Sequence, residues 1–141
     1  MHKILIFLTI SFALFCQASF AETCPSVNDI KNQKLTSGWG AYDSADGTAL
    51  PPSRMAQLVT YIDQFALAEW SGASKNGGVV HCYYRDKHGS DLEAYFSKDN
   101  FKPDNAKNVW YQVSGSMHCA AGNDKCAFQS NMPAEQQLAK K

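Results

Sequence analysis

The strictest alternation of apolar and polar residues in the chain lies between Val79 and Phe96, in the stretch VVHCYYRDKHGSDLEAYF. Period-two alternation on both sides of Lys87-His88-Gly89 predicts a β-hairpin closed by a three-residue loop, with Gly89 in the left-handed conformation. One face of this hairpin is apolar, with Val80, Cys82, Tyr84, Leu92, Ala94 and Phe96, and the other carries His81, Tyr83, Arg85, Asp91, Glu93 and Tyr95.

The length of the loop sets the register that we expect. With three loop residues, Arg85 lies opposite Asp91, and the pairing continues with Tyr84 and Leu92, Tyr83 and Glu93, Cys82 and Ala94, and His81 and Tyr95. A loop shorter by one residue would place Asp86 opposite Asp91 and would mix polar with apolar side chains on both faces. The three-residue register is therefore favoured.

A second pattern has the period of a helix. Ser53 follows two prolines and is expected to cap a helix over residues 53–63, whose apolar face comprises Met55, Leu58, Val59, Ile62, Phe65 and Ala66. The end of this helix is ambiguous, because the residues from Phe65 onward also alternate as in a strand. We expect the strand to cover residues 65–71.

Weaker signals complete the fold. Ser26 is placed to cap a short helical turn that runs through Ile30, and short strands are expected at residues 39–42 and 109–114. The sequence therefore predicts an α+β fold, dominated by an antiparallel β-meander with one packed helix.

The first 21 residues read as a secretory signal peptide. Lys3 precedes an apolar run that is short for a membrane span, and small residues at Ser19 and Ala21 suit cleavage after Ala21. An N-terminal membrane anchor is the alternative. A single exported domain is then expected at residues 22–128, followed by a polar C-terminal tail at 129–141, in the periplasm or outside the cell.

Charge narrows the choice of partners. The whole chain carries 13 basic and 13 acidic residues, and loss of the leader would leave 12 against 13. Without a basic stripe, nucleic acid is a poor partner. The exported part contains no second apolar run long enough for a membrane.

The four cysteines outside the leader predict disulfides, because a small exported chain with an even count is typical of a disulfide framework. Three pairings are possible, and we favour Cys119 with Cys126, since Gly122 and Asn123 allow a sharp turn between them. That choice leaves Cys24 with Cys82. No zinc-ligand spacing occurs, so neither a metal nor another cofactor is predicted.

The polar face of the hairpin is the candidate site. His81, Tyr83, Arg85, Glu93 and Tyr95 share it, and an exposed Trp39 in its glycine-flanked loop is expected to add to the surface. Aromatic side chains beside charged groups are typical of recognition surfaces. A non-enzymatic binding or interaction module is therefore expected, with a protein or a carbohydrate as partner.

Other functions remain open at this point. A His near a carboxylate can act as a general base, so His81 with Glu93 would suit a small secreted hydrolase. An inhibitory or structural envelope protein is a further alternative. The sequence contains no nucleophile elbow and no phosphate-binding loop, and it identifies no catalytic residue.

Four spaced motifs, CPSVNDI, GWGAY, FALAEW and GGVVHCYYR, followed by a later Cys, resemble a family of small exported bacterial proteins, domain of unknown function 3757. Together they span most of the chain beyond the leader. The resemblance implies a β-rich fold, supports a bridge between Cys24 and Cys82, and favours a strand near Phe65. It implies no activity and no catalytic residues.

The cysteine pattern gives a first test. The exported protein should contain two disulfides and no free thiol, because all four cysteines have partners in an oxidising compartment. Thiol titration of the denatured, unreduced protein should read close to zero. Two or more reactive thiols, or stoichiometric zinc, would contradict the disulfide reading.

Overall fold

The computed structural model describes residues 21–72 and 77–131. Nine strands and two helices follow one another as β1 (Ala21–Glu22), α1 (Val27–Lys31), β2 (Gly40–Asp43), α2 (Pro52–Tyr61), β3 (Ile62–Ser71), β4 (Val79–Asp86), β5 (Asp91–Asp99), β6 (Phe101–Pro103), β7 (Tyr111–Val113), β8 (Ser116–Cys119) and β9 (Phe128–Ser130). The predicted signal peptide lies outside the described residues, apart from Ala21. The predicted tail begins inside β9, and its last ten residues lie outside the described part.

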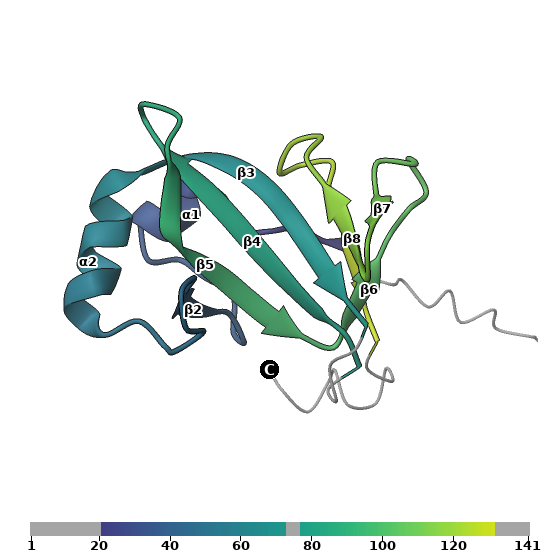
Figure 1. Cartoon of the computed structure of the whole chain (residues 1–141), viewed down its shortest axis with the longest axis horizontal. Coiled ribbons are helices and arrows are strands. Elements are labelled where there is room, and N and C mark those ends of the chain that lie inside the picture. Colours follow the sequence, from purple (N-terminus) through teal and green to yellow (C-terminus); the bar gives the residue numbers. More distant parts are fainter. Residues whose placement is uncertain (1–20, 73–76, 132–141) are drawn as a thin grey trace, which may run out of the picture.

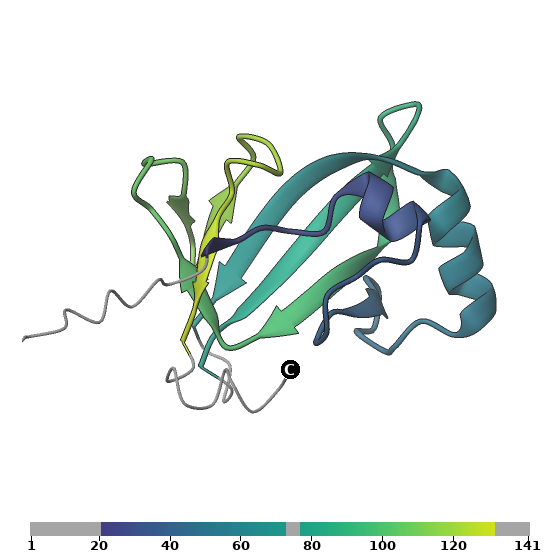
Figure 2. The same ribbon diagram turned by 180° about the vertical axis from the view of Figure 1, so that it is seen from behind.

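Two antiparallel sheets form the fold. The larger has the strand order β2-β5-β4-β3-β8-β7, and the smaller has the order β1-β9-β6. The long strands β3, β4 and β5 form the expected meander, and α1 lies across the far face of the sheet in Figure 1, which Figure 2 brings to the front. Helix α2 lies at one end of the same sheet. The predicted α+β fold with a β-meander, a packed helix and two disulfides is confirmed.

The face covered by α1, here called the inner face, holds the core. Tyr84 is among its largest members, and its hydroxyl donates a 2.6 Å hydrogen bond to the carbonyl of Pro25. The buried apolar side chains are Cys24, Ile30, Leu58, Ile62, Ala68, Val80, Cys82, Tyr84, Ala94, Phe96, Phe101, Trp110, Cys119, Cys126 and Phe128. The apolar face predicted for the hairpin belongs to this core, apart from the half-buried Leu92.

Both predicted disulfides are present. Cys24 is bonded to Cys82 across 5.8 Å between Cα atoms, and Cys119 to Cys126 across 5.6 Å. The first closes a long loop and ties the segment before α1 to the centre of β4. A disulfide that closes a longer loop removes more entropy from the unfolded chain. On this argument Cys24–Cys82 stabilises the fold by about 4 kcal/mol and Cys119–Cys126 by about 2.5 kcal/mol.

The hairpin register is correct at the turn and wrong beyond it. Gly89 has φ 81° and Arg85 pairs with Asp91, as expected. The next pair is Tyr83 with Tyr95, so three residues of β5 lie opposite Tyr84 alone. A bulge thus shifts the remaining pairs by two residues, to Cys82 with Phe96 and His81 with Ser97. Because the shift is even, both faces keep their predicted residues.

Helix α2 begins and ends earlier than predicted. Its N-cap is Pro51, without a side-chain hydrogen bond, and Ser53 lies inside the helix. Pro52 is the first helical residue, and proline suits this position because an N–H group there would have no intrahelical acceptor. At the other end the chain enters β3 directly at Ile62, which is buried as a strand residue rather than on the helix.

Other strands differ from expectation in extent or were not foreseen. Short strands were expected at residues 39–42 and 109–114, and the structure has β2 and β7 there. The cap of α1 is Ser26, as predicted. Strand β8 and the whole smaller sheet carry no clear period in the sequence, because their strands have only two to four residues.

The junction between α2 and β3 gives a test of the core. Ile62→Asp would bury a carboxylate without a partner at a fully buried position and should cost several kcal/mol of unfolding free energy. Gln57→Asp, on the exposed side of α2, should cost less than about 0.5 kcal/mol. Urea denaturation of both variants measures the difference, and equal stabilities would show that Ile62 is not a core residue.

Candidate functional site

A continuous row of ring and polar side chains crosses the outer face of the six-stranded sheet. We call it the outer row, and it contains Tyr42, Tyr95, Tyr83, His81, Glu69, His118 and Tyr111. Strand pairing alone produces it, because Tyr42 pairs with Tyr95 and Tyr95 with Tyr83, while His81 pairs with Glu69, Glu69 with His118 and His118 with Tyr111. The two ladders join on β4, where His81 and Tyr83 lie two residues apart and therefore on one face.

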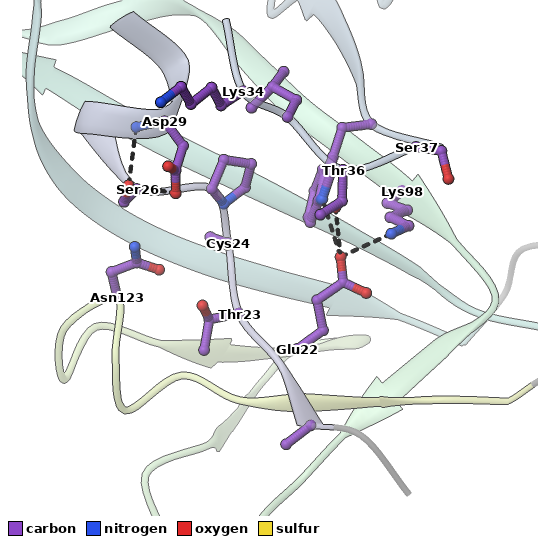
Figure 3. A pocket seen from close by; sticks show the side chains of 14 residues that line it. Glu22, Thr23, Cys24, Ser26, Asp29, Lys34, Thr36, Ser37, Lys98 and Asn123 are labelled. Atoms are coloured by element: carbon purple, nitrogen blue, oxygen red, sulfur yellow. Dashed lines mark hydrogen bonds and ion pairs between the residues drawn. The ribbon is translucent and has the colours of Figure 1, made fainter. Parts of the chain in front are cut away.

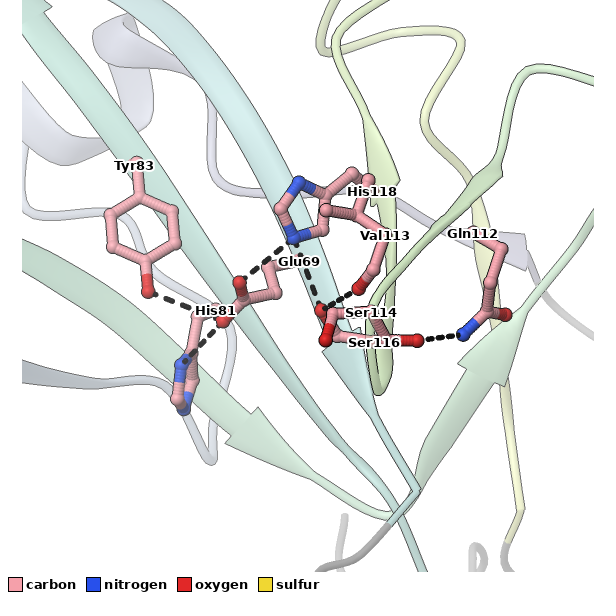
Figure 4. Close-up of polar contacts among 8 residues, drawn as sticks. All are labelled: Glu69, His81, Tyr83, Gln112, Val113, Ser114, Ser116 and His118. Carbon is pink, nitrogen blue, oxygen red and sulfur yellow. Dashed lines mark hydrogen bonds and ion pairs between the residues drawn. The ribbon is translucent and has the colours of Figure 1, made fainter.

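Glu69 is the centre of the polar part of the row (Figure 4). Its Oε2 lies 2.9 Å from Nε2 of His118, and its Oε1 lies 3.7 Å from Nδ1 of His81. The hydroxyl of Tyr83 donates to the same Oε1 at 3.5 Å. One carboxylate on β3 thus contacts side chains from both neighbouring strands, and the Glu69 side chain remains 30% exposed.

The second half of the row is aromatic. Tyr42 stacks on Tyr95 with ring centroids 5.7 Å apart, and Tyr95 lies 5.6 Å from Tyr83. The ring of His81 lies 4.5 Å from that of Tyr95, which closes a cluster over β2, β5 and β4. All four side chains are half-buried, so each ring presents part of its surface to solvent.

Ser116 lies next to His118 but does not complete a catalytic triad. The Ser116 Oγ lies 3.1 Å from Nε2 of His118, the same nitrogen that contacts Glu69. In a nucleophilic triad the carboxylate and the serine contact opposite nitrogens of the imidazole. The carboxylate orients the ring through one nitrogen, and the other nitrogen takes the proton of the serine hydroxyl. The Ser116 hydroxyl also donates to the carbonyl of Val113. Ser116 and Glu69 thus share one nitrogen of His118, which differs from the triad arrangement.

Burial shifts the pKa values of two neighbouring residues in the row, His81 and Tyr83. It lowers the pKa of His81 below the ordinary value of 6.5, and the opposing effects of Glu69 and Asp99 do not reverse the shift. Burial, with a contribution from Glu69, raises the pKa of Tyr83 to about 12. His81 is therefore neutral and Tyr83 is a protonated donor at neutral pH, which leaves the charge of Glu69 uncancelled by His81.

Three of the six predicted site residues come together. His81, Tyr83 and Tyr95 all belong to the outer row. Arg85 lies closer to the turn, where its Nε donates to Asp91 at 2.7 Å. Glu93 is exposed within the bulged part of β5, four residues from Ser97, the actual partner of His81. The carboxylate beside His81 is therefore Glu69 and not the predicted Glu93.

Trp39 lies apart from the outer row. Its Nε1 donates to Oε1 of Glu22 at 3.1 Å, and the same oxygen accepts from Nζ of Lys98 at 2.7 Å (Figure 3). The Trp39 ring packs edge-on against Phe128 at 6.1 Å. Trp39, Glu22 and Lys98 line a polar pocket of about 400 Å³ beside β1, so Trp39 contributes to this pocket and not to the outer row.

Glu69 and His118 were not predicted as site residues. Glu69 stands in a segment that alternates in the sequence, but a register shift between Phe65 and Leu67 places Phe65 against the core and Glu69 on the outer face. The sequence does not show which residue pairs with Glu69, because the turn between β3 and β4 has no turn type that would fix the register of the two strands. His118 belongs to β8, a strand that the sequence did not indicate.

Two further hollows lie away from the row. One of about 510 Å³ lies between the helices and is lined by Ile30, Gln33, Leu35, Pro52, Met55, Ala56 and Val59. The other, of about 300 Å³, lies between α2 and the start of β5. Neither includes a residue of the outer row. Within residues 21–72 and 77–131, no group of three or more His, Cys, Asp or Glu side chains is placed to hold a metal ion, and no helix there is long and apolar enough to cross a membrane.

The lowered pKa of His81 predicts a pH effect on stability. The unfolded chain binds this proton more readily than the folded one, so the contribution of His81 is complete above pH 6.5 and declines as the pH falls below it. Between pH 7.5 and 5.5 the melting temperature of the native protein should therefore fall by about 2 °C more than that of His81→Gln. His88→Gln, in the exposed turn, is the control and should follow the native protein. A native fall no larger than that of His81→Gln would contradict the burial of a neutral His81.

Comparisons of this chain with protein-family models, with curated proteins and with solved structures found no match. The resemblance to domain of unknown function 3757 therefore stays a prediction that rests on sequence motifs. No ligand, partner or activity comes to this chain from a relative. The geometry of the outer row carries the functional conclusion.

Proposed function

We propose that this protein is an exported, non-enzymatic binding module whose outer row contacts its partner. The observation that carries the proposal is the continuity of the row, which has at least one ring or polar side chain on each of the six strands. At a strand spacing of about 4.8 Å, the row is about 24 Å long. That length suits an extended ligand lying across the strands.

The composition of the row supports recognition. Four tyrosines, two histidines and one glutamate offer flat apolar surface together with donors and acceptors. Aromatic side chains of this kind give large contact areas at a low cost in conformational entropy. Tyr111 is 49% exposed at the end of the row, so the surface remains accessible up to its last strand.

The disulfides support a rigid surface. Cys82 lies between His81 and Tyr83 in β4 and is bonded on the inner face to Cys24. Cys119 follows His118 directly and is bonded to Cys126. A surface held in one arrangement before binding loses less entropy when the partner docks. Two disulfides also suit an oxidising compartment, which supports export.

The hydrolase alternative has less support. His81 lacks the proposed Glu93 as a neighbour, and His118 contacts Ser116 and Glu69 through a single nitrogen. A serine-type hydrolase needs a histidine that takes a proton from the nucleophile through one ring nitrogen while a carboxylate orients it through the opposite nitrogen. Neither histidine has these two contacts. The described pockets also lie away from both histidines.

A double substitution tests the binding function. Tyr83→Ala with Tyr95→Ala removes the middle of the aromatic cluster and all four of its ring pairs. At about 0.5 kcal/mol for each half-buried pair, this should cost about 2 kcal/mol of stability without unfolding the domain. Ligands found by screening immobilised peptides and oligosaccharides should bind this variant at least tenfold more weakly than the native protein. Biolayer interferometry gives the dissociation constants.

Tyr61→Ala is the matched control, because Tyr61 is 62% exposed on α2, away from the row. It should bind like the native protein. Ligands that bind the double variant and the native protein equally would place the binding surface elsewhere. Hydrolysis of a screened compound that is abolished by Glu69→Gln would overturn the non-enzymatic reading.

A further inference from the structure

The charges around the outer row point to the kind of partner that it takes. Strand pairing places Glu69 and Asp91 on the outer face with the guanidinium of Arg85, and Glu93 lies exposed in the bulged part of β5. With His81 neutral, these three carboxylates and one guanidinium carry a net charge of −2. Asp46 also lies close enough to Tyr95 to contribute to raising the pKa of that phenol. Carboxylates therefore outnumber cationic groups among these residues.

The rings reinforce this preference. The faces of tyrosine rings carry negative electrostatic potential and attract ammonium and guanidinium groups. Tyr42, Tyr83 and Tyr95 form one cluster with the neutral ring of His81, and centroid separations of neighbouring rings range from 4.5 to 6.3 Å. A cation above this cluster gains from several rings at once, whereas an anion is repelled by both the rings and the carboxylates.

Glu69 offers an acceptor at the edge of the cluster. Its Oε2 is engaged by His118 at 2.9 Å, but the contacts of Oε1 with Tyr83 and His81 are long, at 3.5 and 3.7 Å. A carboxylate oxygen has lone pairs for more than one short hydrogen bond. An incoming cation can therefore make a shorter, charge-assisted bond to Oε1 than either present neighbour makes.

We propose, on the basis that the outer row is the binding surface, that its partner is an extended peptide segment rich in Lys or Arg. One cationic side chain of the peptide binds Oε1 of Glu69 and lies against the rings of Tyr83 and Tyr95. At about 3.3 Å per extended residue, a row of about 24 Å accommodates about seven residues. The acid excess adds affinity for such a segment and adds none for a neutral glycan of the same length.

Binding of defined seven-residue probes tests this inference. The probes are a blocked peptide of alternating Lys and Ser, its counterpart with Glu in place of Lys, and a neutral β-linked hexasaccharide. Isothermal titration calorimetry should detect the Lys peptide alone, with affinity falling as salt rises from 0.05 to 0.3 M, because salt screens charges at these distances. Glu69→Gln should weaken binding of the Lys peptide about tenfold or more.

Asp63→Asn is the matched control for Glu69→Gln. Asp63 is an exposed acid on the same strand, six residues and about 20 Å from Glu69. This variant should change the affinity less than twofold. In an amide NMR titration of the native protein with the Lys peptide, the largest shift changes should fall on β3, β4 and β5 near Glu69, His81 and Tyr83, which gives a readout that needs no variant.

The outcomes separate this inference from the proposed function. Equal binding of the Lys and Glu peptides, unchanged affinity in Glu69→Gln, or shift changes confined to residues outside the row would overturn the cationic partner. Binding of the hexasaccharide that Tyr83→Ala with Tyr95→Ala abolishes would also overturn it, while the row remains the binding surface. If each probe that binds the native protein binds the variant with Tyr83→Ala and Tyr95→Ala equally well, the inference and the proposed function are both wrong.

Discussion

The rest of the structure depends on the alternation of β4. Its inward residues Val80, Cys82 and Tyr84 are each at most 1% exposed, and its outward residues His81 and Tyr83 belong to the outer row. Two interactions on the inner face hold this orientation, namely the bond from Cys82 to Cys24 and the hydrogen bond from Tyr84 to Pro25. A slip of one residue would break both and would turn two polar side chains into the core. These two interactions on the inner face therefore fix which residues of β4 belong to the outer row.

Pairing extends this order from β4 to the edges of the sheet. Each neighbouring strand contributes a residue whose place follows from a register. In β3 the register shifts by one residue between Ile62 and Gln64 and again between Phe65 and Leu67, before the strand reaches Glu69. In β5 the adjustment is an even one, so Tyr95 faces outward beside Tyr83 while Phe96 remains buried. The carbonyl of Glu93, inside the bulge, accepts a hydrogen bond from the amide of Ser44. The irregular segment thus also binds the loop after β2 to the sheet.

The sequence allowed prediction of faces better than of partners. Alternation is a local property, so the inner and outer residues of the hairpin were correct, and the spacing of the cysteines gave both bridges. Register is a property of two strands, and the β5 bulge has no mark in a sequence that keeps its period. For the same reason His81 was assigned the wrong carboxylate. Glu69 and His118 required the pairing of β3 with β4 and with β8, which neither turn chemistry nor strand length specified.

The smaller sheet has a consequence for how the chain reaches its final form. Strand β1 at Ala21–Glu22 pairs with β9 at Phe128–Ser130, so the first and last described strands are hydrogen-bonded neighbours. Contacts between such distant segments give a high contact order, which slows folding because a long loop must close before they form. Because synthesis proceeds from the N-terminus, this sheet can close only after residue 130 has been made. Until then β1 lacks its neighbour, and the smaller sheet is completed late, when nearly all of the chain is available.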